Sequence, residues 1–325
     1  MKAIVFDNPG GEDVLKLGEV APPTLGPAEI RIRVRATAVN RADLLQRQGM
    51  YPPPPGASSL LGLECAGEVI EVGSDVDDWS AGDRAMALLA GGGYAEEAVV
   101  HHGSAMPVPA SMGFEEAGAL PEVFLTAFLN LFLLGQARRN GWALVHGGGS
   151  GVGTAAIQLL KEGGLQSIVT AGSSEKCDRC VALGATHAIN YRDGDFAATV
   201  RTLTDGRGVD VVLDHVGGKY LAGNLEALAV DGRLVIIGLI GGAKAEINLA
   251  ALLIKRMQVI GSTLRTRSVE DKASLVDSFW SMFGEAIEAG RIKPVVDRVL
   301  PLAQAGEAHR VVQASEHFGK VVLRV

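Results

Sequence analysis

Several features of secreted, membrane and nucleic-acid-binding proteins are scarce or missing in this chain. Its 325 residues include three cysteines, Cys65, Cys177 and Cys180, which are too few and too odd in number for a disulfide framework. The longest apolar run, Phe124 to Leu134, is interrupted by Thr126 and Asn130 and is too short to cross a bilayer, so we interpret it as a buried or half-buried helix. The net charge of −7 argues against nucleic-acid and anionic-membrane partners. We therefore expect a globular cytoplasmic protein whose first residues form a strand and not a signal peptide.

A glycine cluster between an apolar strand and a helix is the most informative motif. The strand is Ala143 to Val145, and the helix carries apolar residues at Ala156, Leu159 and Leu160. Glycines allow close approach of the backbone, and a helix N-terminus offers unpaired N–H groups to a pyrophosphate. Residues 148–153 match the dinucleotide-binding pattern G-x-G-x-x-G except that Ser150 replaces the middle glycine. The motif predicts that Ser150, Gly151 and Val152 contact a dinucleotide, with the Ser150 hydroxyl as an added donor.

The end of the next strand indicates which dinucleotide. In NAD-binding proteins a carboxylate about 20 residues after the motif binds the ribose 2′-hydroxyl. Here Ser167 to Ala171 is followed by Gly172, Ser173 and Lys176. A 2′-phosphate is attracted by an ammonium group and hydroxyl donors, so we expect NADPH in preference to NADH. Glu175 is the residue that argues against this choice.

The arrangement of apolar segments predicts the domain organisation. Short β-like runs separated by turns fill the first 120 residues or so, and six continuous apolar strands alternating with helices follow. Such strands are typical of a parallel sheet covered on both faces, here a doubly wound α/β unit. We expect a β-rich domain over 1–122, a cofactor domain over 123–264, and a tail over 265–325 that rejoins the first domain. The cofactor would lie in the cleft between the domains.

Specific stretches of the chain resemble one family. They include residues 39–49, 53–58, 61–64, 85–89, 151–159 and 169–173. In these stretches the chain resembles a zinc-free quinone oxidoreductase of the medium-chain dehydrogenase/reductase superfamily, in the group that includes zeta-crystallin. Within that group it resembles most closely the tumour-suppressor-inducible type. The resemblance implies a GroES-like catalytic domain, a six-stranded Rossmann domain, NADPH as donor and small quinones as acceptors. It also implies a homodimer formed through edge strands of the cofactor domains.

Zinc ligands are replaced at the positions where zinc-dependent relatives carry them. Asn40 stands in the place of a cysteine and Leu63 in the place of a histidine. Neither side chain can substitute for thiolate or imidazole, so we expect no metal and disfavour alcohol dehydrogenation. Cys177 and Cys180, an isolated pair, are interpreted as ordinary helix residues.

The remaining expected site residues divide into two groups. Asn40 and Tyr51 are the catalytic candidates, with Gln46 a weaker one; Tyr51 would hydrogen-bond the acceptor or supply a proton, although it could equally pack on the neighbouring prolines. Tyr191 is implied as a cofactor contact by the resemblance. The loops after the last three sheet strands and the helix joining the domains add further expected cofactor contacts, namely Thr126, Val216, Gly238, Leu239, Ile240, Leu264 and Arg265.

Two other functions stay open. One is an NADPH-dependent enoyl reductase of conjugated C=C bonds that uses Tyr51 as proton donor. The other is a non-catalytic NADPH-binding protein.

Overall fold

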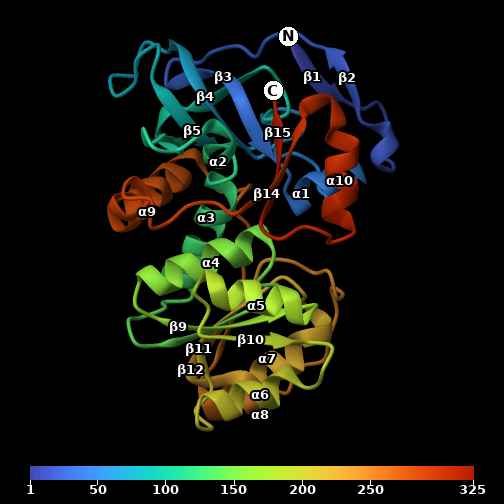
Figure 1. The fold of residues 1–325 in the computed structure, drawn as a ribbon, viewed down its shortest axis with the longest axis vertical. Coiled ribbons are helices and arrows are strands. Elements are labelled where there is room, and N and C mark those ends of the chain that lie inside the picture. The colour runs from blue at the N-terminus through green and yellow to red at the C-terminus, as the bar shows by residue number, and fades with distance from the viewer. The chain divides into compact units, whose positions relative to one another are not determined.

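The structure, a computed structural model, describes residues 1–325 and divides into two compact units (Figure 1). The β-rich unit comprises Met1–Leu125 and Leu264–Val325, and the α/β unit comprises Thr126–Thr263. The domain boundaries expected from the sequence fall after residues 122 and 264, and the two units of the structure divide after residues 125 and 263. No helix of the structure combines the length and apolar character that a membrane span requires.

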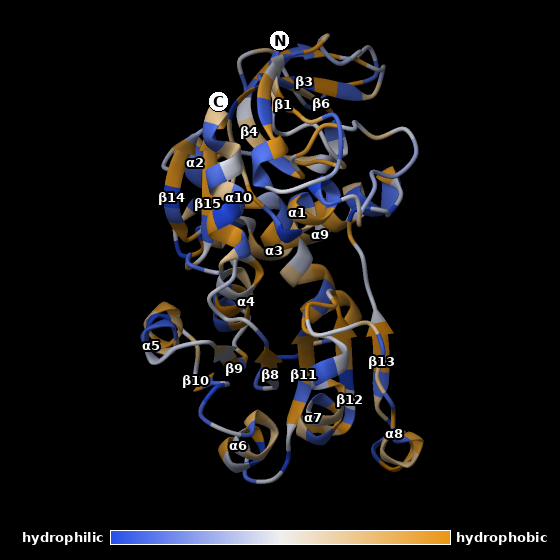
Figure 2. Ribbon diagram, turned by 90° about the vertical axis from the view of Figure 1, so that its right-hand side faces the viewer, coloured by the Kyte–Doolittle hydropathy of each residue, from blue (hydrophilic) through white to orange (hydrophobic).

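The α/β unit is built on a six-stranded parallel sheet. Its order is β10-β9-β8-β11-β12-β13, which Figure 2 shows side by side. The strands are β8 (Trp142–Val145), β9 (Gln166–Ala171), β10 (His187–Asn190), β11 (Val209–Asp214), β12 (Leu228–Ile236) and β13 (Gln258–Gly261). The chain winds outward from β8 to β10 and then returns to β11 on the other side of β8. Ligands of such sheets bind at the carboxyl ends beside this switch point.

The helices of this unit connect consecutive strands. They are α4 (Gly151–Glu162), α5 (Ser174–Leu183), α6 (Phe196–Leu203), α7 (Leu221–Ala227) and α8 (Leu249–Lys255). Leu144, Ile168, Val212 and Leu234 of the sheet are fully buried in its core. The doubly wound sheet expected from the unbroken apolar strands is therefore confirmed.

The expected apolar helix before the sheet is present in two parts. Helix α3 covers Pro121–Phe128, and the next turn, Leu129–Leu134, has the wider π-helical geometry. Leu125 and Leu131 are fully buried, which agrees with the interpretation as a buried helix.

The β-rich unit contains a seven-stranded main sheet and a separate hairpin. The hairpin joins β1 (Lys2–Val5) to β2 (Lys16–Glu19). The main sheet runs β14-β15-β3-β4-β5-β7, with β6 pairing to β3. Its strands are β3 (Glu29–Ala38), β4 (Glu64–Val72), β5 (Arg84–Leu88), β6 (Glu97–His101), β7 (Ala105–Pro107), β14 (Val296–Pro301) and β15 (Lys320–Arg324).

The last segment of the chain is part of this main sheet. Strand β15 pairs antiparallel with β3, so that Leu323 lies opposite Thr37. Four helices surround the sheet, namely α1 (Arg41–Arg47), α2 (Phe114–Ala117), α9 (Val269–Glu288) and α10 (Ala305–Gln313). Because β15 runs antiparallel to β3, the residues at the start of β15 lie next to the residues that follow the end of β3. This pairing builds the polar cluster described below.

Candidate functional site

The glycine loop of the α/β unit has the close packing that the motif predicts. An added Cβ at Gly153 would lie 2.2 Å from the Gly147 carbonyl oxygen, and one at Gly148 would lie 2.8 Å from the Val169 side chain. Only glycine fits at either position. The loop leads into α4, where the N–H groups of Gly151 and Val152 have no acceptor within the helix. These donors and the helix dipole fit the pyrophosphate of a dinucleotide.

The Ser150 hydroxyl serves the helix instead of pointing outward. Its oxygen accepts the Gly153 N–H at 3.0 Å, and its proton is donated to the Gly147 carbonyl at 2.7 Å. Serine is a preferred residue at this position before a helix. The hydroxyl thus caps α4 in the structure, and its contact with a phosphate stays a prediction.

Four residues expected at the adenosine end lie together beyond β9 and β10. Ser173 caps α5 by accepting the Lys176 N–H at 3.2 Å. An added Cβ at Gly172 would lie 2.7 Å from the Tyr191 hydroxyl, so the ring lies against the glycine. The Tyr191 N–H is donated to the Ala171 carbonyl at 3.1 Å. This group offers an ammonium, a hydroxyl and an aromatic ring at one edge of the sheet.

A buried chain of side chains, not expected from the sequence, joins the carboxyl ends of β8, β9 and β11. Burial lowers the pKa of His146 to about 3, so the imidazole is neutral. Its two nitrogens lie 3.0 Å from Thr170 Oγ1 and 2.7 Å from Asn224 Oδ1. Asn224 Nδ2 donates to Asp214 Oδ2 at 3.0 Å. The hydrogen bonds are all satisfied if the threonine hydroxyl donates to Nδ1 and Nε2–H donates to the amide.

The chain ends on a loop that carries expected cofactor contacts. Asp214 accepts the N–H groups of Val216 at 2.7 Å and Gly217 at 3.0 Å. The next loop is joined to this one, since the Gly241 N–H is donated to the Val216 carbonyl at 2.6 Å. Gly238, Leu239 and Ile240 begin that second loop, and Leu239 and Ile240 expose more than half of their surface. The structure thus groups these four expected contacts at the carboxyl ends of β11 and β12.

Three expected cofactor contacts lie elsewhere. Thr126 is on α3, where its carbonyl accepts a hydrogen bond from Asn130 Nδ2 at 2.7 Å. Leu264 and Arg265 belong to the β-rich unit and are buried there. The cofactor role of these three residues stays a prediction.

Asn40, which stands where the zinc-dependent relatives carry a cysteine, belongs to a closed polar cluster in the β-rich unit. Asn40 Nδ2 donates to Glu64 Oε1 at 2.9 Å, and Lys320 Nζ lies 2.7 Å from both Glu64 Oε1 and Asn40 Oδ1. Both ends of the Asn40 amide are therefore occupied. Leu63 beside them is 1% exposed. No group of three or more metal-binding side chains occurs in the structure.

Asp43 holds the backbone around this cluster. Its carboxylate accepts the Asn40 N–H at 2.8 Å and the Gly62 N–H at 3.0 Å. Tyr94 donates to it at 3.4 Å and lies 3.1 Å from His309. Burial is the main cause that raises the pKa of Asp43 to about 6. The carboxylate thus fixes the two segments that bear Asn40 and Leu63.

Tyr51 is held by a buried arginine. The Arg265 guanidinium lies 5.3 Å from the centre of the Tyr51 ring and 3.4 Å from its carbonyl oxygen. The guanidinium also donates to Gln46 Oε1 at 2.7 Å and to the Ala90 carbonyl at 2.8 Å. Burial, and then the nearby Glu122, raise the pKa of Tyr51, so its hydroxyl keeps its proton. Gln46 therefore positions Arg265 and, through it, Tyr51.

Glu122 connects the Asn40 cluster with Tyr51. Its N–H is donated to Glu64 Oε2 at 2.9 Å, while its carboxylate is near enough to Tyr51 and Arg265 to influence both pKa values. Burial and the negative charge of Glu64 raise the pKa of Glu122 to about 8. Lys272, whose ammonium donates to the Arg265 carbonyl at 2.8 Å, borders the same group.

Sequence reasoning missed Lys320, Glu122, Lys272 and the His146 chain as parts of these sites. Glu64 directly follows Leu63, one of the two positions compared with zinc-dependent relatives. A buried carboxylate requires a cationic partner. That partner, Lys320, is 256 positions away along the chain. Nothing near either residue in the sequence indicates the pair.

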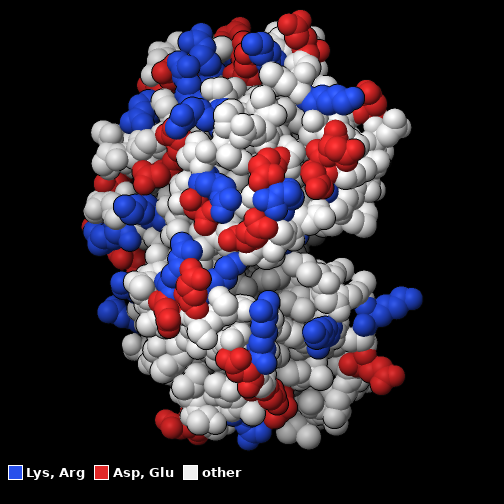
Figure 3. Space-filling view, turned by 45° about the vertical axis from the view of Figure 1, so that its right-hand side comes forward, with Lys and Arg blue, Asp and Glu red and all other residues white.

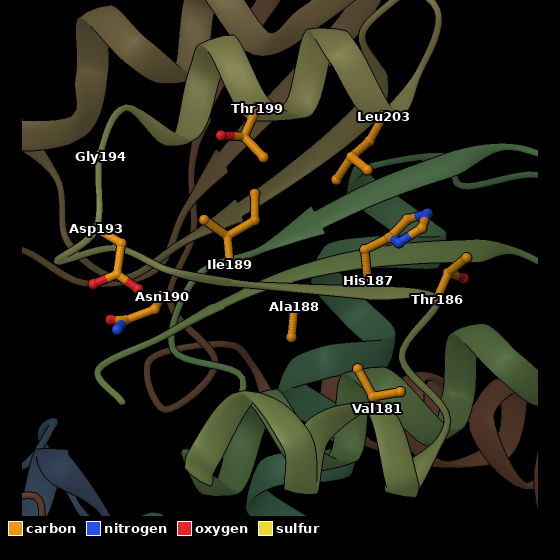
Figure 4. A pocket seen from close by; sticks show the side chains of 10 residues that line it. All are labelled: Val181, Thr186, His187, Ala188, Ile189, Asn190, Asp193, Gly194, Thr199 and Leu203. Carbon is orange, nitrogen blue, oxygen red and sulfur yellow. The ribbon is translucent and has the colours of Figure 1, made fainter. Parts of the chain in front are cut away.

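A groove of about 500 Å³ lies along the edge strand β10, apart from these groups (Figure 4). Val181 of α5 and Thr199 and Leu203 of α6 face it, and His187 and Asn190 form its floor. None of the expected site residues lines it.

Comparison with known proteins agrees with this architecture. Residues 26–110 match the alcohol dehydrogenase GroES-like domain, and residues 151–280 match the zinc-binding dehydrogenase model. The quinone oxidoreductase of Rattus norvegicus is 31% identical over 99% of this chain and 97% of its own length. The synaptic vesicle membrane protein VAT-1 homolog of Mus musculus is 32% identical over 99% of this chain and 83% of its own length.

Solved structures of several activities share the fold. The Escherichia coli quinone oxidoreductase complexed with NADPH is 30% identical, with a TM-score of 0.88 and complete coverage of both chains. An NAD-dependent alcohol dehydrogenase is 34% identical, with the same TM-score and coverage. The CurK enoyl reductase is 28% identical, with a TM-score of 0.87 over 99% of this chain and 98% of that one. These three structures share the fold of this chain, although their names give different activities.

Proposed function

Because the chain belongs to the medium-chain dehydrogenase/reductase superfamily, whose members it matches along nearly its whole length, we propose that it is a zinc-independent NADPH:quinone reductase. The observation that carries the proposal is the closed cluster of Asn40, Glu64 and Lys320 beside Leu63. A site without thiolate or imidazole ligands cannot hold zinc to polarise an alcohol. It can serve an acceptor that is already electron-poor, such as a quinone.

The α/β unit would hold the cofactor. Gly151 and Val152 offer N–H groups to the pyrophosphate, and the fit of the glycine loop allows its close approach. Gly172, Ser173, Lys176 and Tyr191 offer a place for the 2′-phosphate and adenosine, where Lys176 supplies the positive charge. When bound, NADPH supplies a hydride. The protein's own contribution is to position the reactants and to exclude water.

Tyr51 would orient the acceptor. Its hydroxyl stays protonated because its pKa is raised, so it can donate a hydrogen bond to a quinone oxygen. Arg265 and Gln46 restrict the ring to one place. The charge distribution does not favour nucleic acid as a partner. On the face in Figure 3, acidic and basic side chains are interspersed and form no continuous basic stripe.

The test is turnover of NADPH and NADH with small ortho- and para-quinones, followed by the loss of reduced-nicotinamide absorbance. We expect a strong preference for NADPH, which Lys176→Ala reduces about tenfold through loss of a charge-assisted contact worth about 1.4 kcal/mol. Arg179→Ala on the exposed face of the same helix is the matched control. Tight NADPH binding without any quinone turnover would refute the quinone reaction and favour the enoyl or non-catalytic alternative.

Enoyl reduction remains the second candidate because a protonated Tyr51 also suits proton donation to a reduced C=C bond. In an enoyl reductase, Tyr51→Phe should nearly abolish turnover of conjugated enones. In a quinone reductase it should only weaken turnover. Assaying both substrate classes with this variant separates the two functions.

We also propose a homodimer formed through the edge of the α/β sheet. Strand β13 is an edge strand, and α8, which precedes it, exposes apolar side chains. Leu249, Leu253 and Ile254 are 68%, 78% and 73% exposed, and Val259 of β13 is 39% exposed. The outer edge of β13 has no partner strand, and an unpaired strand edge beside such an apolar surface favours pairing with a second copy.

A further inference from the structure

Glu122 differs from the other carboxylates of the polar cluster. Glu64 accepts hydrogen bonds from Asn40, Lys320 and the Glu122 N–H, and Asp43 also accepts three. The side chain of Glu122 accepts none of these donors; only its backbone joins the network. It is also not sealed off, since the residue keeps partial exposure while the residues on either side, Pro121 and Val123, are buried.

Charged groups from several elements lie around Glu122, and one of them is the Arg265 guanidinium, a cation whose pKa the Glu122 carboxylate influences. Glu64 on β4 and Asp43 on α1 are negative, and both favour a proton on Glu122. Lys320 on β15 and Lys272 on α9 are positive and oppose it. Both ammonium groups, however, already donate to other acceptors, Lys320 to Glu64 and Lys272 to the Arg265 carbonyl.

The balance of these effects leaves Glu122 protonated near neutral pH. Burial is the largest cause and Glu64 the next, and together they raise its pKa to about 8. The same carboxylate influences Tyr51, so the two side chains lie near each other in the β-rich unit. A carboxylic acid with this pKa is a far stronger proton donor than a tyrosine whose pKa is itself raised.

The proposed reaction requires such a donor. A quinone that accepts a hydride gains two electrons and one hydrogen, and it needs one further proton to become a hydroquinone. We propose that Glu122 is the proton donor of this site. In this step the Glu122 O–H bond breaks, an O–H bond forms on the reduced acceptor oxygen, and solvent later returns a proton to the carboxylate. The inference rests on the proposed function and names the origin of the proton.

The first experiment observes the proton directly in the ligand-free protein. Infrared spectra recorded from about pH 6 to pH 10 should show a protonated-carboxyl carbonyl band that disappears with an apparent pKa near 8. We expect Glu122→Gln to lack this titration. Glu115→Gln, which changes an exposed carboxylate paired with Arg324, should retain it. The proposal is overturned if Glu122→Gln keeps the band or if the wild type shows no titration in this range.

The second experiment measures the pH dependence of kcat with a quinone. The wild-type kcat should fall as pH rises through about 8, and Glu122→Gln should lower kcat about 100-fold at about pH 7 without that fall. Glu122→Asp should restore much of the rate with a shifted profile. A purely structural role would instead lower kcat equally at all pH values, and that result would refute the proposal. Because glutamine keeps the backbone N–H that binds Glu64, we expect the variant to fold.

The two inferences can fail separately. If the band titrates as described but no quinone is reduced, the proposed function is wrong while the proton remains assigned to Glu122. If quinones are reduced and neither the band nor the profile depends on Glu122, the function stands and the proton donor is wrong.

Discussion

The buried pair of Lys320 and Glu64 gives the sharpest test of how the β-rich unit is held together. Lys320 is 3% exposed and Glu64 is fully buried, and Nζ lies 2.7 Å from Oε1. Replacing Lys320 with methionine keeps most of the aliphatic volume and removes the charge. Glu64 is then left ionised in the interior, and the Val39 carbonyl and Asn40 Oδ1 lose their donor as well. Breaking one side of a buried ion pair costs about 3–5 kcal/mol.

The assay must report on this unit alone. Trp79 and Trp280 lie in the β-rich unit, and Trp142 lies in the α/β unit. In a Trp142→Phe background, tryptophan fluorescence during urea unfolding therefore follows the β-rich unit. We expect Lys320→Met to lower its free energy of unfolding by about 3–5 kcal/mol. Arg310→Met, which breaks a surface pair with Glu307, should cost less than about 1 kcal/mol.

A double variant decides whether the buried charge is the cause. In Lys320→Met with Glu64→Gln no unpaired charge remains, so the loss should be smaller than the sum of the single losses by about 2 kcal/mol. Additive losses would refute the reasoning, because they would show that packing and not charge determines the cost. A loss below about 1 kcal/mol for Lys320→Met alone would do the same.

Three further predictions concern the cofactor loop, the assembly and the carboxyl group of Glu122. Gly153→Ala places a Cβ 2.2 Å from the Gly147 oxygen and should weaken NADPH binding more than about tenfold in a fluorescence titration. The control is Gly261→Ala, whose Cβ meets nothing within 4 Å and which should bind NADPH normally. Leu253→Glu should convert a dimer into a monomer in analytical ultracentrifugation; an unchanged mass would place the interface elsewhere. Since the folded pKa of Glu122 is raised, its proton stabilises the folded state at low pH, and this contribution is lost as pH rises through about 8. Glu122→Gln should therefore gain stability relative to wild type on going from about pH 5 to pH 9, by up to about 1.4 kcal/mol per pH unit. A constant difference in urea unfolding across this range would contradict the raised pKa.

The cofactor unit was the more predictable part of the molecule. Its strands are continuous apolar runs, and its glycine loop and helix are adjacent in sequence, so local pattern alone predicts the sheet and the Gly151–Val152 donors. The same local reasoning did not predict that the Ser150 hydroxyl caps α4, because the motif was compared with a cofactor loop and not with a helix cap. Similarly, the pattern predicts one helix over 124–134 but not the change to π-helical geometry at Leu129.

The β-rich site was less predictable because its contacts join distant parts of the chain. Asn40 was recognised from its position after a strand, but its two partners lie 24 and 280 positions away. Arg265 is predicted as a cofactor contact because it lies in the loop after the last strand of the parallel sheet. In the structure it binds Gln46, 219 positions earlier, and it supports Tyr51. Side-chain chemistry indicates that each group needs a partner, but only the fold of β15 against β3 determines which partner it finds.

This difference has a chemical consequence for the proposed reaction. In the α/β unit, the proposed binding groups are backbone N–H groups at a helix start, so many sequences with suitable glycines would serve. In the β-rich unit, Lys320 and Asn40 donate to one oxygen of Glu64 and the Glu122 N–H donates to the other, while the Glu122 carboxyl group has a raised pKa. The negative charge of Glu64 thus favours a proton on Glu122, and the positive charge of Lys320 opposes it. If this coupling holds, Lys320→Met should raise the pKa of Glu122 further, because a cation that opposes its protonation is removed. An infrared titration of Lys320→Met that shifts to lower pH would contradict the coupling.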